Sequence, residues 1–547
     1  MAIRRLALAL SLALLVPLVA QAGVGGPPAA VDPARLVQPT FVVRGHGWGH
    51  GIGLSQWGAY GFARSGATYG RILGHYYPGT TLGPAPIRKV RVLLATGAAQ
   101  VTLSSKDDLR VRDATGITYD LAAGRHTLKR DLKLLVDTAE KPQALAGPLL
   151  FTAGVEPLAL ADRTYRGGFE VSVANGKLQV INVLGLEQYL YGVVPSEVPD
   201  DWPAEALKAQ AVVARSYALS HLQRGAFDLY ADTRSQVYRG IPEEELSTTA
   251  AVNATAGQVV LYAGKVASTY YHSTSGGRTA AVGDVWRGST PIPYLVSVPD
   301  PYDSASPHHA WGPLALSATR LARVLKVPGT LVDVRQTVNA SLRATDVVGV
   351  GVAGTGPAID ASEFRRALGL RSTWFTIGVL AIERPTGPVA FGAKLNLRAV
   401  ARGLGKVTVE QRAAGTPEWA ALSTIKPRSD GTLAVGVKPR MVTHYRLSTK
   451  DATSVAVRVA VAPLVKISTA LDGTGLVGLV RPAQAGTVVQ VQRRIGTAWK
   501  PAGTAVVDDV GRWAATISLD AGSYRARVPA GAGLAAGTSA VLTVPGA

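Results

Sequence analysis

The stretch Gly192-Val-Val-Pro-Ser-Glu-Val-Pro199 leads directly into a run with helical periodicity, Pro203–Leu222. It presents one carboxylate, Glu197, in a predicted loop that Pro195 and Pro199 stiffen. Valines on both sides give the carboxylate apolar surroundings, where the cost of desolvating a charge raises a carboxyl pKa. A carboxyl group that keeps its proton near neutral pH can act as a general acid. Glu197 is therefore the candidate catalytic residue.

The N-terminus has the pattern of an export signal. Arg4 and Arg5 precede an apolar run, Leu6–Val19, and an Ala20-Gln21-Ala22 cleavage pattern. The apolar run is short for a membrane span and contains Pro17, so we expect cleavage rather than a transmembrane anchor. The sequence thus predicts a secreted or otherwise extracytoplasmic protein, placed in the cell wall or the periplasm.

The chain is strongly basic. Its formal net charge is +20 at pH 7, and +18 remains once the two arginines of the signal are removed. Such a surplus favours polyanionic partners. Because export is predicted and the cations are spread along the chain, we expect the anionic polymers of a bacterial wall and no nucleic acid. The sequence has no cysteine, which excludes disulfides and thiolate metal ligands.

Strand and helix patterns do not alternate regularly in the main body, which predicts an α+β fold. Strand patterns occupy Val90–Leu94, Val101–Leu103, Phe169–Val173, Val259–His272 and Tyr294–Val298. Helical spacing follows Pro203, with Asp200 and Asp201 as candidate caps, and recurs over about Leu316–Leu325 and Ser362–Leu368. Alternating glycines from Gly45 to Gly53 argue against a regular helix in that segment.

The tail from about residue 385 is rich in Val, Thr and Gly, and it repeats itself. Val407–Arg412 corresponds to Val489–Arg493, and Trp419, Gly431 and Tyr445 correspond to Trp499, Gly511 and Tyr524. The single-residue pairs lie 80, 80 and 79 residues apart, close to the length of one small β-sandwich. We therefore predict two Ig-like β-sandwich modules, residues 385–464 and 465–547, which act as spacers or wall-affinity modules without catalysis.

The remaining boundaries follow from these patterns. We expect a signal peptide over residues 1–22, a flexible lead-in over 23–37 and a catalytic domain over 38–384. Within that domain, residues 38–85 form a Gly- and His-rich segment and residues 86–384 form the main body.

Three sets of motifs together resemble the SpoIID/LytB family of bacterial wall proteins. The first set is Tyr189–Leu219. The second is Tyr271–Arg278, followed in the sequence by Asp284–Trp286 and Tyr294–Asp303. The third is Gly45–Ala59 with His75–Gly79. The resemblance covers most of residues 40–380 and none of the tail. It implies a SpoIID-like catalytic domain and a lytic transglycosylase that acts on peptidoglycan glycan strands. In sporulation members of the family these strands have already lost their stem peptides.

The resemblance also implies roles for individual residues. The family's essential acid/base glutamate corresponds to Glu197, and Arg215 corresponds to a substrate-positioning or structural arginine. The family's Gly-His-Gly segment follows the stretch matched here by Glu363–Phe375, whereas in this chain it comes first, so the order looks circularly permuted. Some relatives hold zinc through cysteine; because this chain has no cysteine, we predict no metal and no cofactor.

The number of carboxylates at the site decides between two reactions. Glycoside hydrolysis ordinarily uses two, and the candidates for a second carboxylate are Glu187, Glu205 and Asp284. A lytic transglycosylase needs one, which protonates the leaving oxygen and then helps the muramoyl 6-hydroxyl attack its own anomeric carbon. Because we expect Glu205 to serve a helix N-terminus, we favour the single-acid reaction.

Further polar side chains are candidate substrate-binding residues, namely Arg215, His46, His50, Gln56, His272, Ser273 and Ser275. Each has a structural alternative. Arg215 could form a buried ion pair, and His46, His50 and Gln56 could support a tight Gly-rich turn. His272, Ser273 and Ser275 could cap the turn at Gly276. A Ser–His nucleophile is disfavoured, because neighbouring residues on a strand point to opposite faces. His309 and Trp311 either shape the edge of the cleft or pack.

Taken together, the residues and the resemblance predict an exported peptidoglycan lytic transglycosylase. It would cleave the MurNAc–GlcNAc bond with Glu197 and leave 1,6-anhydro ends. One alternative is a non-catalytic, wall-binding enhancer of an N-acetylmuramoyl-L-alanine amidase, with that amidase as partner. The other is a conventional hydrolase with two carboxylates.

Overall fold

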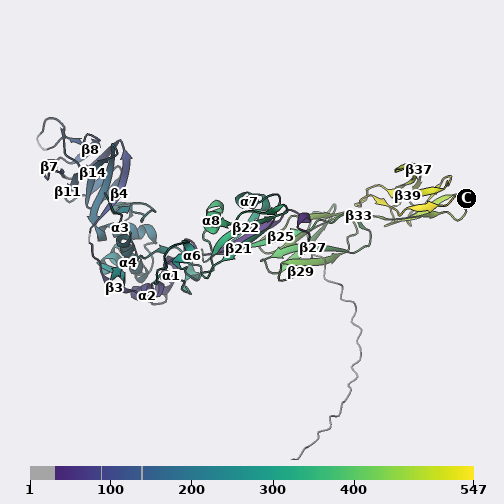
Figure 1. Cartoon of the computed structure of the whole chain (residues 1–547), viewed down its shortest axis with the longest axis horizontal. Helices are drawn as coiled ribbons and strands as arrows, with labels where there is room; N and C mark the ends of the chain where they lie inside the picture. Colours follow the sequence, from purple (N-terminus) through teal and green to yellow (C-terminus); the bar gives the residue numbers. More distant parts are fainter. Residues whose placement is uncertain (1–30, 88, 137–138, 547) are drawn as a thin grey trace, which may run out of the picture. The chain divides into compact units, whose positions relative to one another are not determined.

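The computed structural model describes residues 31–87, 89–136 and 139–546 (Figure 1). The predicted signal peptide and most of the predicted lead-in lie outside these residues. The chain divides into two compact units. One, the body, comprises residues 38–379 with 450–452; the other, the tail unit, comprises the described part of 1–37 with 380–449 and 453–547. No helix in the described part of the chain is long and apolar enough to cross a membrane.

The largest sheet of the body has seven strands in the order β16-β4-β15-β14-β11-β6-β7. Their bounds are Leu229–Tyr230, Lys89–Ala98, Lys177–Gly185, Gly168–Ala174, Leu149–Ala153, Leu109–Arg112 and Thr118–Leu121. The predicted strands at Val90–Leu94 and Phe169–Val173 lie in β4 and β14. The one at Val101–Leu103 lies in β5 (Gln100–Ser105), part of a neighbouring four-stranded sheet. The predicted mixture of strands and helices is confirmed.

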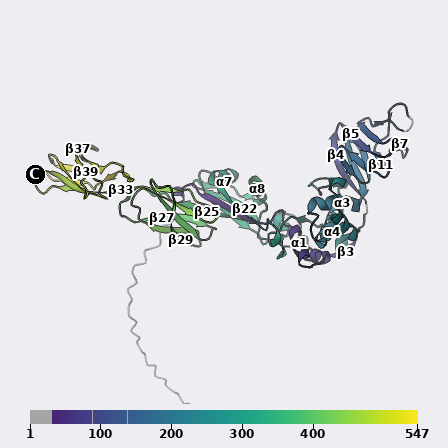
Figure 2. The same ribbon diagram turned by 180° about the vertical axis from the view of Figure 1, so that it is seen from behind.

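Helix α4 (Ala204–Ser220) is buried on two sides and forms the scaffold of the body. Its predicted apolar stripe, from Leu207 to Ala218, packs in the core shared with α3 (Leu186–Glu197) and the seven-stranded sheet. Val212 and Val213, on another side, belong to a second core. A helix that is apolar nearly all round is a buried helix. Figures 1 and 2 show α3 and α4 beside the sheet from opposite directions.

The start of α4 differs from the prediction in one detail. The residue before the first turn is Pro203, and no side chain caps the helix, so neither Asp200 nor Asp201 serves as a cap. Proline suits this position because the N–H groups of a first turn have no partner within the helix.

The Gly- and His-rich segment completes the second core. It contains β1 (Thr40–His46), β2 (Leu54–Ser55), α1 (Gln56–Arg64), α2 (Tyr69–Tyr76) and β3 (Thr81–Pro84). Strand β2 pairs in parallel with β19 (Tyr271–His272), and β3 pairs with β17 (Gln258–Tyr262). The segment is therefore built into the body by pairing with residues distant in the sequence.

The glycines of this segment have the irregular backbone that their spacing predicts. Gly47, Gly49, Gly51 and Gly53 have φ angles of 73°, 111°, 85° and 70°. Gly51 has a second requirement, because a Cβ there would collide with the guanidinium of the buried Arg343.

The later part of the body confirms two predicted helices, as α7 (Ala318–Val324) and α8 (Ala361–Leu368). The predicted strand at Tyr294–Val298 is wrong, because turns and extended coil occupy it. Prolines at 291, 293 and 299 flank these residues and cannot donate to a strand ladder. The region 259–272 holds three short strands, β17, β18 (Lys265–Val266) and β19, rather than one.

The tail unit is built of strands throughout its described length after residue 385, as predicted. Its first module contains β27 (Leu395–Arg402) paired with β30 (Thr432–Val437), and a sheet in the order β29-β28-β31-β32. The strands of that sheet span Ala420–Ile425, Val407–Ala413, Thr443–Ser448 and Val457–Val459.

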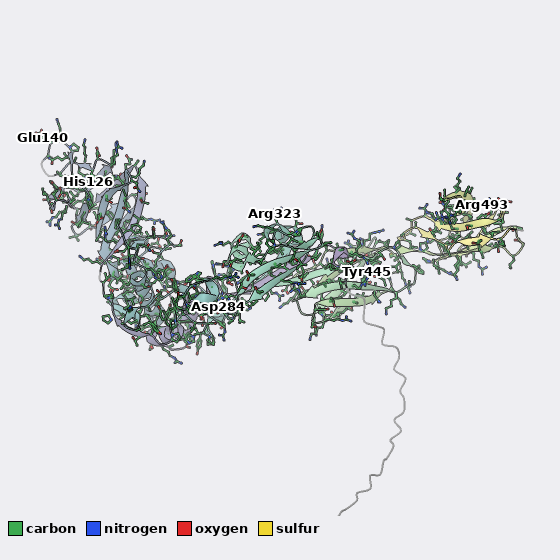
Figure 3. All side chains as sticks on the ribbon, in the orientation of Figure 1. His126, Glu140, Asp284, Arg323, Tyr445 and Arg493 are labelled. Atoms are coloured by element: carbon green, nitrogen blue, oxygen red, sulfur yellow. The ribbon has the colours of Figure 1, made fainter. Side chains whose placement is uncertain are left out.

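The second module contains two sheets that share one core. One is β34-β35-β38 (Leu464–Thr469, Gly475–Arg481, Arg512–Thr516) and the other is β37-β36-β39-β40 (Ala498–Val506, Val488–Ile495, Gly522–Val528, Gly537–Thr538), with β41 (Leu542–Val544) beside β39. Tyr445 and Arg493, labelled in Figure 3, lie in β31 and β36. Tyr445 and Tyr524, which correspond in the sequence repeat, are both 1% exposed.

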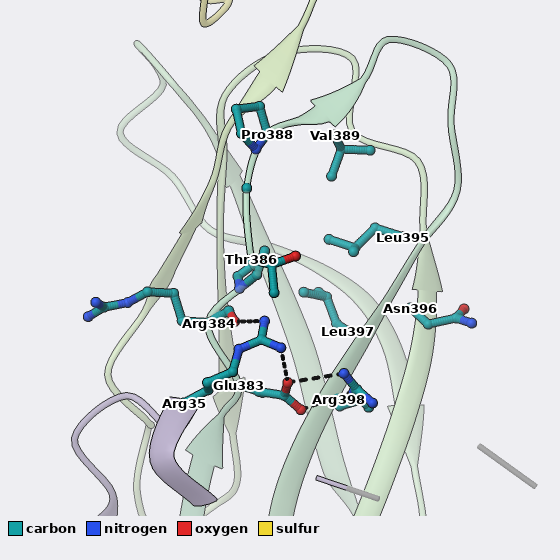
Figure 4. Close-up of a pocket in the computed structure, with 12 residues that line it drawn as sticks. Arg35, Glu383, Arg384, Thr386, Pro388, Val389, Leu395, Asn396, Leu397 and Arg398 are labelled. Atoms are coloured by element: carbon teal, nitrogen blue, oxygen red, sulfur yellow. Dashed lines mark hydrogen bonds and ion pairs between the residues drawn. The ribbon is translucent and has the colours of Figure 1, made fainter. Parts of the chain in front are cut away.

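A buried carboxylate ties the described lead-in to the tail unit. The Glu383 side chain is 3% exposed and forms two ion pairs. Its Oε1 lies 2.9 Å from Arg35 Nη1, and its Oε2 lies 3.0 Å from Arg398 Nε. Arg35 also donates to the Arg384 carbonyl. Figure 4 shows these side chains in the wall of a pocket of about 370 Å³. Arg35 and Arg398, which both line this pocket, are thus already paired with Glu383.

Candidate active site

Glu197 is the last residue of helix α3, where the sequence predicted a loop. The helix passes through Pro195, and the Val198 N–H still bonds to the Val194 carbonyl at 3.1 Å. Proline removes one hydrogen bond and crowds one carbonyl, which the last turn of a helix tolerates because it ends there. Val193, Val194 and Val198 are buried as expected.

The Glu197 side chain is partly exposed, and its surroundings favour the protonated form. Burial raises the pKa of Glu197 above its ordinary value, while hydrogen bonds from the Tyr271 hydroxyl and the Val237 backbone N–H act in the opposite direction. The C-terminal end of a helix also disfavours a negative charge. The side chain can therefore hold a proton, and two donors are in place to receive the carboxylate once that proton leaves.

A chain of buried polar groups orients these donors. Gln236 Nε2 donates to the Tyr271 hydroxyl at 3.1 Å, and the Tyr189 hydroxyl donates to Gln236 Oε1 at 3.2 Å. Because the Tyr271 oxygen accepts from Gln236, its own proton is directed to Glu197. Burial raises the pKa of Tyr271 well above its ordinary value, with the Glu197 charge as the next cause, so the phenol stays protonated.

The Gly- and His-rich segment reaches the site from two directions. Gln56 Nε2 donates to the Glu197 backbone carbonyl at 3.2 Å, which satisfies a carbonyl at the end of α3. His50 Nδ1 accepts from the Ile52 N–H at 3.0 Å, and its ring also bonds to the backbone of Tyr271. Burial lowers the pKa of His50 to about 4, so the imidazole is neutral. Gln56 thus contacts the backbone of Glu197, and His50 contacts the backbone of Tyr271.

His46 and His272 make contacts within the protein. The His46 ring lies 4.9 Å from the Trp374 ring and 6.1 Å from the His309 ring, centroid to centroid. His272 is 5% exposed, and its Nδ1 lies 3.2 Å from the Ile52 carbonyl oxygen. Burial lowers the pKa of His272 well below its ordinary value, so this ring is also neutral.

Ser275 belongs to a buried network with two aspartates. Its Oγ donates to Asp300 at 2.8 Å and its N–H donates to Asp303 at 2.8 Å. Asp303 also accepts from Ser55 Oγ at 2.8 Å and pairs with His309 at 2.9 Å. Ser273 differs: its Oγ lies 3.4 Å from the Thr274 hydroxyl, and its carbonyl accepts from the Trp57 N–H.

Arg215 occupies the buried ion pair that was its structural alternative. Its side chain is fully buried and bonds to Glu187 through Nε at 3.1 Å and Nη2 at 2.5 Å. It also donates to the carbonyls of Gln258 and Val252. A guanidinium enclosed in this way joins α3, α4 and β17 and offers no surface to a substrate.

The three candidate second carboxylates have other partners. Glu187 lies in the first turn of α3, ten residues and about 15 Å of helix from Glu197. Glu205 accepts from the Tyr69 N–H at the start of α2 and from Lys208, each at 2.7 Å. Asp284, on the segment labelled in Figure 3, accepts from the Ser341 hydroxyl and N–H.

A pocket of about 440 Å³ lies beside the loop that serves Glu197. It is lined by Val237, whose N–H bonds to the carboxylate, and by aromatic and basic side chains including Tyr165, Arg163 and Arg239. Within the described residues, no group of three or more His, Asp or Glu side chains could hold a metal ion.

Sequence reasoning did not single out Tyr271, Gln236 or Val237. Tyr271 opens one of the quoted motifs, and its place beside a His-Ser-Thr-Ser run could have marked it. Gln236 and Val237 carry no local signal, because their contacts with Glu197 and Tyr271 come from a loop that returns from elsewhere in the chain.

Comparison with known proteins places the segment around Glu197 among matched sequences. Residues 174–262, which contain Glu197, match the family model described as SpoIID, Stage II sporulation protein. An uncharacterized protein of Brachyspira hyodysenteriae is 39% identical over 138 residues, which cover 24% of this chain and 37% of that protein. The "Amidase enhancer" of Bacillus subtilis is 39% identical over 24% of this chain and 17% of its own length.

A third relative extends the match. The "Stage II sporulation protein D" of Bacillus amyloliquefaciens is 30% identical over 35% of this chain and 59% of its own length. The chain thus spans less than two thirds of each of these relatives. The family has a cell-wall-related role, and the matched segment contains the candidate acid and the helix behind it. The chain is therefore similar to the SpoIID family over residues 174–262 and to these relatives over 24–35% of its own length.

Proposed function

We propose that this protein is an exported lytic transglycosylase that cleaves the MurNAc–GlcNAc bond of peptidoglycan, with Glu197 as its single acid and base. The observation that carries the proposal is the environment of Glu197. Burial favours its protonated form, and two hydrogen-bond donors point at the carboxylate that proton loss creates. A group that gives up and regains a proton in one reaction needs both properties.

The reaction balances with this one residue. Protonated Glu197 gives its proton to the glycosidic oxygen as the bond to the anomeric carbon breaks. The 6-hydroxyl of the same muramoyl sugar then attacks that carbon and loses its proton to the Glu197 carboxylate. Because attack is intramolecular, no activated water is needed, and the acid is regenerated.

The positions of the other carboxylates support this reaction over hydrolysis. Glycosidases that use two carboxyl groups hold them roughly 5–9.5 Å apart. Glu187 lies well beyond that range from Glu197, and Glu205 and Asp284 are engaged in capping and turn contacts.

The test is digestion of purified, peptide-stripped glycan strands, followed by mass spectrometry of the new ends. We expect 1,6-anhydro ends from the protein and a loss of about 10²–10⁴-fold in rate for Glu197→Gln. Glutamine keeps the acceptor oxygen for Tyr271 but has no transferable proton. Glu156→Gln, an exposed site with the same loss of charge, should leave the rate unchanged.

Two results would contradict the proposal. Reducing ends that incorporate oxygen from labelled water would indicate a hydrolase with a second carboxylate. Unchanged glycan, together with faster cleavage by an added N-acetylmuramoyl-L-alanine amidase, would indicate an amidase enhancer. That second function is favoured by the 39% identity to the "Amidase enhancer" of Bacillus subtilis.

A further inference from the structure

The two tail modules repeat one surface arrangement, in which an arginine lies over a tryptophan ring. The Arg446 guanidinium lies 4.2 Å from the centre of the Trp419 ring, and the Arg525 guanidinium lies 4.4 Å from that of Trp499. The two arginines occupy equivalent strands, β31 and β39. Such stacking fixes the plane of a guanidinium at a surface.

Strand alternation places these pairs on the outward faces of their sheets. In β39 the residues that alternate with Arg525 and Arg527 belong to the module core. Side chains two residues apart share a face, so both arginines point away from the core. Across the strands they pair with Gln492 and Gln490 of β36, which therefore share the outward face.

The stacked arginines are anchored through Nε. Arg525 Nε donates to Gln492 Oε1 at 2.7 Å, and Arg446 Nε donates to Glu410 Oε2 at 2.6 Å. In the part of the chain that the structure describes, the Nη groups of Arg525 make no further hydrogen bond. Two Nη donors on a fixed plane match two oxygens of a phosphate.

The charge on these faces is one-sided. In the second module the outward residues of β36 and β39 include Arg494, Arg525 and Arg527 and, among the described residues, no carboxylate. In the first module, Arg412 and Arg458 flank His444, whose pKa is lowered by burial first and then by these two arginines. Glu410 is the acid that faces Arg446 there.

We propose that the outward face of β36, β37 and β39, centred on Trp499 and Arg525, binds a phosphodiester-linked sugar or polyol polymer of the wall. The equivalent face around Trp419 and Arg446 is the weaker of the two. The faces differ at the residue that anchors the stacked arginine, because Gln492 leaves Arg525 its full charge whereas Glu410 offsets that of Arg446. This binding concerns retention on the wall, and its test uses no cleavage step, so it stands apart from the role of Glu197.

The experiment measures binding of the full chain to poly(glycerol phosphate) by titration calorimetry at low and high salt. We expect Arg525→Gln to weaken binding by about tenfold or more, because it removes the charged donors that face the phosphate. Lys466→Gln is the matched control: it removes one exposed cation from the same module but on the other sheet, and should change affinity little. High salt should weaken binding of the unmodified chain.

A reciprocal exchange separates binding from a merely structural role of the stacking. Gln492→Glu imports the acid of the first module beside Arg525 and should weaken binding, whereas Glu410→Gln should strengthen it. Both changes keep the arginine's hydrogen-bond acceptor and the tryptophan contact, so the thermal midpoint should stay within a few degrees. Circular dichroism of each variant checks this.

Three outcomes would overturn the proposal. Equal losses for Arg525→Gln and Lys466→Gln would show attraction to bulk charge only. Unchanged affinity after Gln492→Glu would show that the stacking is structural. Tighter binding of peptide-stripped glycan, which carries muramoyl carboxylates but no phosphodiester, than of poly(glycerol phosphate) would show that the face does not select phosphate.

Discussion

At the scale of single residues, the protonation state of Glu197 follows from opposing local contributions. Burial favours the neutral acid, and hydrogen bonds from Tyr271 and Val237 favour the carboxylate. Burial was readable from the sequence, because valines surround the glutamate. The two donors could not be predicted in this way. Val237 lies in a loop and Tyr271 in strand β19, and both are distant from α3 in the sequence. Local composition therefore predicts the sign of the pKa change but not the groups that moderate it.

Tyr271→Phe tests this balance through the pH dependence of cleavage. The acid must be protonated, so the rate should fall as pH rises through the raised pKa of Glu197. Removing the hydroxyl deletes a contact that lowers this pKa, so the falling limb should move to higher pH. The maximal rate should drop about tenfold, because the carboxylate formed during reaction loses a donor. An unmoved limb in the pH–rate profile would contradict the assigned contact.

At the scale of elements, the spacing of apolar residues predicted the helices whose buried faces pack in the core. The stripe from Leu207 to Ala218 gave α4 and its buried face, and Asp360 to Leu368 behaves as a capped helix. The prediction failed at Gly192–Glu197, where the prolines indicated a loop but helix α3 continues through Pro195. It also failed at Tyr294–Val298, where flanking prolines cannot donate to a strand ladder. The contact of Gln56 with Glu197 is beyond any local pattern, since 141 residues separate them.

The Arg215–Glu187 pair tests how these elements are joined. Arg215→Met should reduce the free energy of unfolding by about 3–5 kcal/mol, because it leaves Glu187 without its cation. The double variant Glu187→Gln with Arg215→Met should recover part of the loss. Urea unfolding of the three proteins measures both effects. A stable Arg215→Met variant with weakened glycan binding would instead indicate that this arginine contacts substrate.

At the scale of the whole molecule, the two units should respond separately to pH. Burial is the main cause that raises the pKa of Asp300 to about 6, with the charge of Asp303 next. A carboxyl group with a raised pKa binds its proton more tightly when folded. Its contribution to stability is therefore full below about pH 4 and is lost as pH rises towards 6. Asp300 lies in the body, so the tail unit should not share this trend.

Differential scanning calorimetry of the full chain between pH 4 and pH 7 checks this expectation. Relative to an Asp300→Asn variant, the body of the unmodified protein should lose on the order of 2–3 kcal/mol of stability as pH rises, while the buried neutral His50 and His272 add the opposite trend to both proteins. Asp300→Asn removes the opposing contribution, so the body transition of the variant should rise more steeply with pH, and the tail transition should stay in place. A body transition that keeps its pH dependence in the variant would assign the effect to another group.

The parallel pairing of β2 with β19 has a consequence for timing. A ribosome delivers the segment that contains Gln56 first, Glu197 later and Tyr271 later still. The hydrogen bonds that make the acid competent cannot form until all three have emerged and the long intervening chain has closed into a loop. Under the proposed function, a polypeptide that stops short of residue 271 would therefore be inert, because it lacks the hydroxyl that donates to Glu197.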